Sequence, residues 1–289
     1  MSRDMSENAL KQVKWTLKGG RALGPAPFLV AGILNVTPDS FFDGGKYFDL
    51  ENAAEQADLI IGQGADIIDV GGESTRPYSL KVEKDVEISR VLPVVIKILE
   101  NHPRAIISID TSKAGVAASC LDAGAIIVND VSACRHDPGL ADVIAEFKPG
   151  YVLMHCQGDP QTMQNSPRYE DVVDEIKIFF AERLKMLTSK GLPEDRIVID
   201  PGIGFGKSLE HNLRIMRRVD EFFSFGLPVY MGLSNKSMWG SLLGLEPAQR
   251  EKATQVALAL MAARGVHIHR VHDVKATINS LEILKKIWS

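Results

Sequence analysis

The chain has 289 residues, of which 45 % are hydrophobic and 24 % are charged, a balance typical of a globular protein with a packed core. The 33 lysines and arginines stand against 37 acidic residues, so the formal net charge is −4 and no nucleic-acid-binding surface is expected. No run of about 18 apolar residues occurs, and residues 1–10 lack the features of a secretory leader. We therefore expect a chain that binds neither nucleic acid nor membranes.

The three cysteines, Cys120, Cys134 and Cys156, have no CxxC spacing. This arrangement suggests neither a zinc site nor a disulfide framework. A reducing cytoplasm is the expected compartment.

Eight short apolar runs, rich in β-branched residues, recur along the chain and predict eight strands. They lack polar alternation, which is typical of parallel strands covered on both faces. In chain order the runs are Phe28 to Leu34, Asp66 to Val70, Ile106 to Ile109, Ala125 to Val128, Tyr151 to Met154, Ile197 to Ile199, Val229 to Leu233 and Val266 to Val271.

Segments with helical spacing lie between these runs, and several begin at a capping residue and stop at a glycine. Each such glycine is followed directly by a buried strand, which indicates a repeated βα unit. From cap to glycine, the expected helices run from Asp49 to Gly64, from Thr111 or Ser112 to Gly124, from Glu170 or Asp171 to Gly191, and from Pro247 to Gly265.

Repeated βα units without a linker predict an α/β fold made of a single (β/α)8 TIM barrel, and a doubly wound open sheet is the alternative. Polar residues at the carboxyl ends of the strands favour the barrel, because a barrel brings all strand ends to one mouth. We expect residues 1–27 to form an extension that closes the barrel bottom, with a hairpin around Val13 to Leu17, and residues 28–289 to form the barrel domain. The polar strand-end residues are Asn35, Asp69, Asp110, Asn129, Asp130, His155, Asp200, Ser234 and Arg270.

Two groups of these side chains suggest ligand chemistry. Asp110, Asn129 and Asp200, with the amide of Asn35, present donors and acceptors suited to the edge of a planar heterocycle. Asp110 could instead cap the helix that follows it. Arg270 and its alternate neighbour His272 point the same way from one strand end, so they could meet a ring and a phosphate, or simply form a polar helix entrance.

Residues 200–208 form a glycine-rich loop after a strand. They do not form a Walker motif, because Pro201 stands where that motif needs glycine, and their alternating glycines fail the dinucleotide spacing. We expect a flat ligand to lie against this backbone, with Phe205 as an apolar wall.

Seven phrases in order resemble the dihydropteroate synthase family from about Phe28 to the end of the chain: GILNVTPDSF, IIDVGGESTRP, ISIDTS, NDVSA, LMHCQGDPQTMQ, IDPGIGFGKS and IHRVHDVK. The resemblance implies a transferase of folate and tetrahydrofolate biosynthesis. Its reaction would join 6-hydroxymethyl-7,8-dihydropterin pyrophosphate to 4-aminobenzoate by an SN1-like route that releases pyrophosphate and needs Mg²⁺. A homodimer is also implied.

The resemblance assigns roles residue by residue. Asn35 would lie on the magnesium side, and Asp39, Arg76 and Lys236 would be catalytic. The remaining substrate-binding residues would be Thr75, Pro77, Asp110, Asn129, Asp200, Phe205, Ser234, Arg270 and His272.

Three positions depart from the family pattern. Asn235 stands where an arginine is usual, Phe42 where serine is common, and Cys156 where methionine is common. These changes could alter aminobenzoate affinity or the response to sulfonamides. Two alternatives stay open: a pterin-binding methyltransferase domain, which needs no pyrophosphate cluster, and a non-catalytic pterin or folate binder.

Overall fold

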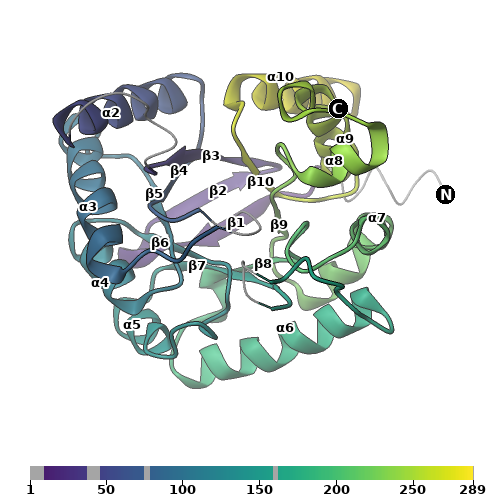
Figure 1. Ribbon diagram of the computed structural model, residues 1–289, viewed down its shortest axis with the longest axis horizontal. Coiled ribbons are helices and arrows are strands. Elements are labelled where there is room, and N and C mark those ends of the chain that lie inside the picture. Colours follow the sequence, from purple (N-terminus) through teal and green to yellow (C-terminus); the bar gives the residue numbers. More distant parts are fainter. Residues whose placement is uncertain (1–9, 38–45, 75–78, 159–161, 289) are drawn as a thin grey trace.

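The structure is a computed structural model that describes residues 10–37, 46–74, 79–158 and 162–288 (Figure 1). Eight parallel strands lie in the order β8-β7-β6-β5-β4-β3-β10-β9, and a parallel bridge between Ile199 and Val229 joins the two ends of this series. The strands therefore form a nearly closed barrel, which confirms the (β/α)8 prediction and excludes the open sheet. Their bounds are β3 Leu29–Asn35, β4 Ile67–Gly71, β5 Ile107–Asp110, β6 Ile127–Asp130, β7 Gly150–Met154, β8 Ile197–Asp200, β9 Tyr230–Met231 and β10 Ile268–Val271.

Helices surround the barrel, as Figure 1 shows. They are α2 Lys46–Gly62, α3 Lys84–Asn101, α4 Ala114–Asp122, α5 Leu140–Phe147, α6 Val172–Ser189, α7 Leu209–Arg217, α8 Ser237–Leu243, α9 Glu251–Ala263 and α10 Val274–Trp288. Short 3₁₀ turns cover Lys18–Gly20, Glu194–Arg196, Val219–Phe225 and Pro247–Gln249. In the described part of the chain no helix combines the length and the apolar character needed to cross a membrane.

Three predicted helix starts differ from the structure. Pro247 opens a short 3₁₀ turn, and α9 begins only at Glu251. The side chain of Asp171 caps α6 by accepting from the N–H groups of Val173 and Asp174, as expected. In contrast, α4 begins at Ala114, whose N–H donates to Asp137 Oδ2 at 2.8 Å. A cap supplied from a later loop has no signature near the helix start, so Thr111 and Ser112 are wrong as caps. Similarly, α2 begins at Lys46, so Asp49 lies inside it.

Strand β9 is shorter than the expected Val229 to Leu233. The carbonyl of Leu233 accepts from the indole N–H of Trp239 at 2.9 Å, so this residue is bonded to α8 rather than to a neighbouring strand. The chain thus leaves the barrel early and brings the segment after β9 over the carboxyl ends of the strands.

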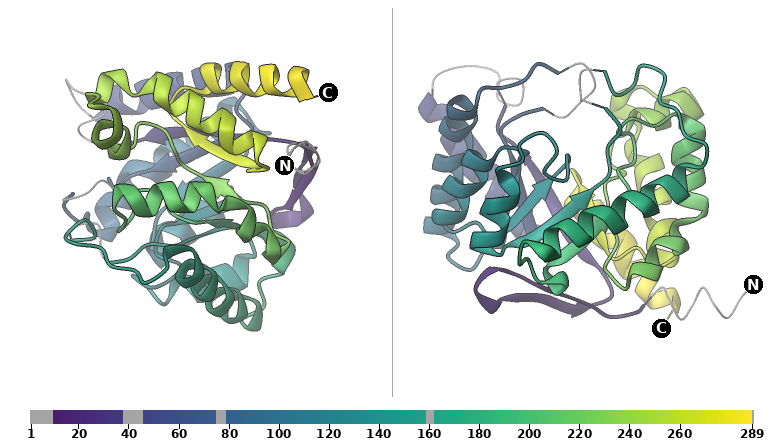
Figure 2. Two further views of the ribbon diagram at one scale, coloured as in Figure 1. Left: turned by 90° about the vertical axis from the view of Figure 1, so that its right-hand side faces the viewer. Right: turned by 90° about the horizontal axis from the view of Figure 1, so that it is seen from below.

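An N-terminal hairpin covers the opposite end of the barrel, and in the right-hand view of Figure 2 it lies beneath the barrel strands. Strand β1 (Val13–Thr16) pairs antiparallel with β2 (Ala22–Ala26), which confirms the predicted hairpin. Trp15 and Leu17 are fully buried in an apolar cluster with residues such as Ile127 at the amino ends of the barrel strands. Residues 1–9 lie outside the described part, and the division into 1–27 and 28–289 stays a prediction.

Candidate active site

A cavity of about 660 Å³ opens at the carboxyl ends of the barrel strands. Its lining mixes polar strand-end side chains with apolar residues from the loops after β6, β7 and β8. The polar and charged residues that line it are Asn35, Thr37, Glu73, Ser74, Asp110, Asn129, Asp200, Ser234, Asn235, Lys236, Ser237, Arg250, Arg270 and His272.

Arg270, from the end of β10, is the centre of a buried polar network. Its Nε donates to Asp69 Oδ2 at 2.5 Å and its Nη2 donates to Asp110 Oδ2 at 2.6 Å. The same oxygen of Asp69 accepts from Asn129 Nδ2 at 3.0 Å. Strands β4, β5, β6 and β10 thus contribute one network, with the guanidinium plane fixed by two carboxylates.

The charges of this network are coupled. Burial disfavours the charged guanidinium, but Asp69 and Asp110 outweigh burial and hold the pKa of Arg270 above its usual value. Burial raises the pKa of Asp110, the Arg270 guanidinium opposes that rise, and the nearby Asp69 adds to it. One guanidinium shared between two carboxylates cannot fully stabilise both as anions. In the structure Oδ1 of Asp69 and Oδ1 of Asp110 are buried without a hydrogen-bond partner among the described residues, so Asp110, which lines the cavity, has acceptor capacity left for a ligand.

Asp200, at the end of β8, lines another part of the cavity. Its Oδ1 accepts from the backbone N–H of Gly202 at 2.7 Å. Burial raises the pKa of Asp200 to about 6, while the Gly202 N–H and Lys236 work in the opposite direction. This environment gives a carboxylate that is largely ionised at neutral pH and partly desolvated.

Lys236 lies beside an aromatic wall. Its Nζ is 4.3 Å from the centre of the Phe205 ring, a cation–π distance. Burial first, and then the Arg270 guanidinium, lower the pKa of Lys236 to about 8 against the opposing effect of Asp200. The ammonium group is therefore retained at neutral pH but is poorly solvated, which strengthens its interaction with any ligand oxygen.

The loop after β8 brings backbone, rather than side chains, close to the cavity. Gly202, Gly204 and Gly206 all adopt positive φ, at 71°, 82° and 62°. A Cβ at Gly202 would lie 1.9 Å from the carbonyl oxygen of His155, and a Cβ at Gly206 would lie 2.2 Å from that of Gln157. These positions require glycine for both conformation and space.

Ser234, which follows β9, also lines the cavity. Its Oγ lies 2.9 Å from His272 Nδ1 and accepts from the His272 backbone N–H at 3.2 Å. Asn235 follows with φ of 55°, a left-handed conformation that asparagine tolerates better than most residues. This conformation gives a physical reason for an asparagine at that position. Arg250 also lines the cavity, so its wall still carries a cation near Asn235.

The structure brings together most of the residues predicted from sequence. The cavity is lined by Asn35, Asp110, Asn129, Asp200, Phe205, Ser234, Lys236, Arg270 and His272. Asp39, Thr75, Arg76 and Pro77 lie outside the described residues, as does Phe42. The alternative in which Asp110 caps the next helix is wrong, because its Oδ2 holds Arg270 and α4 is capped from Asp137.

Sequence reasoning left several functional candidates without a role. From sequence, Asp69 is only a polar strand-end residue, whereas in the structure it holds Arg270. Arg250 lines the cavity although it lies on a segment with no motif. Met154 and Met163 line the cavity and pack in one cluster with Cys156. The phrase LMHCQGDPQTMQ contains all three residues and is the sequence signal that could have indicated this.

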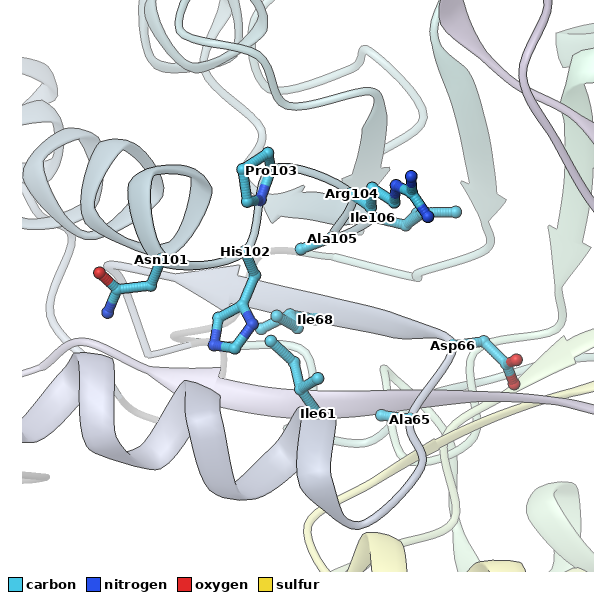
Figure 3. A pocket seen from close by; sticks show the side chains of 10 residues that line it. All are labelled: Ile61, Ala65, Asp66, Ile68, Asn101, His102, Pro103, Arg104, Ala105 and Ile106. Carbon is cyan, nitrogen blue, oxygen red and sulfur yellow. The ribbon is translucent and has the colours of Figure 1, made fainter.

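A second cavity, of about 550 Å³, lies where α2 and α3 end and where β4 and β5 begin (Figure 3). Figure 3 shows apolar side chains such as Ile61, Ile68 and Ile106, together with His102. The ring of His102 already bonds Asp58 at 2.6 Å. Because this cavity faces the amino ends of the strands, it does not meet the polar network of the first.

This chain matches a known protein family over most of its length. A family model described as "Pterin binding enzyme" matches residues 31–272. The chain belongs to the pterin-binding enzyme family. A dihydropteroate synthase of Escherichia coli strain K12 is 43 % identical over 260 residues, which cover 90 % of this chain and 92 % of the relative.

Solved structures of the same family superpose closely. A Yersinia pestis dihydropteroate synthase, solved as a sulfonamide drug complex, has a TM-score of 0.89 at 38 % identity and covers 95 % of this chain and 99 % of its own. A Xanthomonas albilineans dihydropteroate synthase, solved with 4-aminobenzoic acid, has a TM-score of 0.88 at 38 % identity, with 96 % and 98 % covered. Fold and family membership of this pterin-binding enzyme are thus established together.

Proposed function

We propose that this pterin-binding enzyme is a transferase of folate biosynthesis that condenses 6-hydroxymethyl-7,8-dihydropterin pyrophosphate with 4-aminobenzoate. The products are 7,8-dihydropteroate and pyrophosphate. Relatives named dihydropteroate synthase, which match nearly the whole chain, support this reaction. The observation that carries the proposal is the buried network in which Arg270 is held by Asp69 and Asp110 beside Asn129.

The pterin would lie on this network. Its guanidine-like edge offers N–H donors, which suit Asp200 and the unpartnered Oδ1 of Asp110. The side-chain nitrogen Nδ2 of Asn129 bonds Asp69, so the side-chain oxygen Oδ1 of Asn129 is the atom that can accept from a ligand. The guanidinium of Arg270, planar and fixed at two nitrogens, would stack on the ring.

The pyrophosphate would extend from the pterin toward Asn35, His272 and Arg270. Mg²⁺ usually keeps several waters and takes one or two protein oxygens together with substrate phosphates. Among the described residues, no group of three or more His, Cys, Asp or Glu side chains could hold a metal. Asn35, a single amide oxygen on the cavity wall, fits Mg²⁺ that is bound with pyrophosphate, where the ion would neutralise charge on the departing oxygens.

In the reaction, the C–O bond between the pterin methylene and pyrophosphate breaks, and its electron pair leaves with pyrophosphate. The amine nitrogen of 4-aminobenzoate then forms the new C–N bond and loses one proton. An SN1-like order suits this cavity, because the electron-rich pterin spreads positive charge while cations stabilise the leaving group. Asp39 and Arg76 keep their predicted catalytic roles as part of the proposal.

The aminobenzoate would lie between Phe205, Lys236 and Ser234, which all line the cavity. The ring of Phe205 offers an apolar face, while Lys236 and Arg250 attract the carboxylate. Thr75 and Pro77 are the further predicted contacts. Sulfonamides are expected to compete at this place.

The deciding experiment measures pyrophosphate release by the purified protein. Release should require the pterin pyrophosphate, 4-aminobenzoate and Mg²⁺ together. A pterin-binding methyltransferase would release none, and a non-catalytic binder would bind the pterin without turnover. Either result would contradict the proposal.

We also propose a homodimer formed through α9 and α10, which pack side by side. Val256 and Leu260 on α9, and Ile283 and Ile287 on α10, are 63 %, 59 %, 61 % and 69 % exposed. Four exposed aliphatic side chains on adjacent helices favour an interface. Sedimentation should show a dimer for the wild-type protein and a monomer for Leu260→Glu. A monomeric wild-type protein would exclude the proposed dimer.

The cytoplasmic location stays a prediction.

A further inference from the structure

Lys207, in the glycine-rich loop after β8, is a lysine with only 3 % of its surface exposed. Its Nζ lies 3.0 Å from His155 Nδ1, donates to the carbonyl oxygen of His155 at 3.3 Å and donates to that of Phe205 at 3.0 Å. Lysine is rarely buried to this extent unless its donors are satisfied. The two contacts with His155 join this loop to the end of β7, and the third bonds Phe205 within the loop itself.

The partner of Lys207 is itself held in place. The His155 ring meets Phe179 of α6 edge-on, with ring centres 4.9 Å apart at 89°. Burial first, and then the neighbouring Lys207 and Arg135, lower the pKa of His155 to about 2. The imidazole is therefore neutral, so its Nδ1 accepts a hydrogen bond from the lysine.

Other contacts tie the same loop to the chain after β7. Gln164 Nε2 donates to the carbonyl oxygen of Gly204 at 2.5 Å, and the Tyr169 hydroxyl donates to that of Gly206 at 2.8 Å. Both anchors bond glycine carbonyls. Lys207 alone among these three bonds the carbonyl of Phe205, the residue whose ring faces Lys236 in the cavity.

We propose that Lys207 is a positioning residue for the aromatic amine substrate, because it holds the backbone of Phe205 against the end of β7 and thereby fixes the Phe205 ring as a wall of the amine pocket. Lys207 acts through Phe205, without touching the substrate. The inference rests on the proposed function in assigning 4-aminobenzoate to that wall.

A purely structural role would give a different result. If Lys207 served only to stabilise the fold, its substitution would lower the melting temperature and leave the ratio of the two substrate affinities unchanged. If it positions Phe205, substitution weakens the aromatic amine site more than the pterin site, because the Arg270 network lies on β4, β5, β6 and β10 and Asp200 is the last residue of β8, before the loop that Lys207 holds.

The test compares Lys207→Met, Phe205→Ala and the double variant, with Lys190→Met as the control. Lys190 pairs with Asp142 at the surface, at the end of α6 away from the cavity. In Lys207→Met we expect KM for 4-aminobenzoate to rise about tenfold and the Kd for 6-hydroxymethylpterin to change by less than about twofold. The double variant should match Phe205→Ala, because residues that act through one another are not additive.

Additive effects in the cycle, or equal losses for both substrates, would overturn the proposal. Amide hydrogen exchange gives a readout that does not depend on turnover. Exchange should accelerate over residues 202–206 in Lys207→Met and stay unchanged over residues 107–110 of β5. If Lys207→Met does not fold, Lys207→Gln, which keeps one donor group, should show the same selectivity in weaker form. Unchanged exchange over residues 202–206 would contradict the anchoring, whereas a wild-type protein that releases no pyrophosphate would contradict only the proposed function.

Discussion

Arg270 and Asp69 are 201 positions apart in the chain, yet Nε of the arginine lies 2.5 Å from Oδ2 of the aspartate. Asp69 is fully buried, and its Oδ2 also accepts from Asn129. One carboxylate thus orients two of the residues that we assign to the pterin. Its role is to set their direction rather than to contact the ligand.

Asp69→Asn should therefore weaken pterin binding. Both partners donate to Oδ2, which an amide oxygen could replace, but the amide loses the negative charge that holds the Arg270 guanidinium and places a buried NH2 group where Oδ1 has no partner among the described residues. The buried mismatch should cost about 2–4 kcal/mol of binding free energy. Calorimetric titration with 6-hydroxymethylpterin measures this loss.

Asp66→Asn is the matched control, because Asp66 lies just before the same strand at its opposite end and accepts from the Val30 N–H at 2.8 Å. It should leave pterin affinity unchanged. Wild-type affinity in Asp69→Asn would show that Arg270 and Asn129 keep their orientation without the carboxylate.

Asp200 gives the pterin site a pH dependence. Burial raises the pKa of Asp200 to about 6, so the carboxyl is increasingly protonated below that pH and loses acceptor capacity. Pterin affinity should accordingly rise with pH between about 5 and 7. Asp110, whose pKa is also raised, changes affinity in the same direction, so the diagnostic quantity is the difference between wild type and a variant.

In Asp200→Asn, binding should be weakened by about 2–4 kcal/mol at neutral pH, because a donor replaces an acceptor. The remaining pH dependence should be shallower than that of the wild-type protein. Titrations at several pH values measure both quantities. Identical pH profiles for the two proteins would assign the dependence to Asp110 or to the ligand instead.

The two substrates should bind with positive coupling. Ser234, on the aminobenzoate side, lies 2.9 Å from His272, which we assign to the pyrophosphate. Pyrophosphate that orders His272 would also order Ser234. We expect pyrophosphate, Mg²⁺ and a pterin together to raise the affinity for 4-aminobenzoate by about 1–3 kcal/mol.

Titration of 4-aminobenzoate with and without the other ligands measures this coupling. Ser234→Ala should reduce it, because the hydroxyl that joins the two subsites is removed. Equal affinity for 4-aminobenzoate in the presence and absence of pyrophosphate would show that its pocket is preformed.

The barrel could be predicted from sequence because its information is local and periodic: unbroken apolar runs, caps and stopping glycines. The positions of Asp110, Asn129 and Asp200 at strand ends then placed them in one mouth without knowledge of their contacts. The roles of Asp69 and Lys207 could not be predicted in this way. Their partners are distant in the chain, and both differ from ordinary polar residues only in what the fold places beside them.

The same limit applies to local structure. Asp137 caps α4 from the loop after β6, so no residue near the start of that helix predicts the true boundary. The pairing of Leu233 with Trp239 shortens β9 in a way that apolar runs do not reveal. Sequence periodicity identified the elements, and side-chain contacts from other elements set where they end.

Gly202, in the loop after β8, can be compared with Gly191, which precedes β8. The comparison separates the cost of a left-handed backbone from the cost of a steric clash. Gly202 has φ of 71° and Gly191 has φ of 98°. A Cβ at Gly202 would lie 1.9 Å from the carbonyl oxygen of His155, whereas a Cβ at Gly191 would have nothing within 4 Å. Substitution at Gly191 therefore costs only the left-handed conformation, and substitution at Gly202 also forces the loop away from β7.

Gly191→Ala should lower the free energy of unfolding by about 1–2 kcal/mol and leave both substrate affinities unchanged. Gly202→Ala should lower it further and also weaken binding of pterin and 4-aminobenzoate, since the Gly202 N–H bonds Asp200 and the displaced loop carries Phe205. Chemical denaturation and ligand titration on the two variants check this contrast. Equal losses of stability in both variants would mean that the loop moves freely enough to accommodate a methyl group, and it would remove the argument that close backbone contact shapes this side of the site.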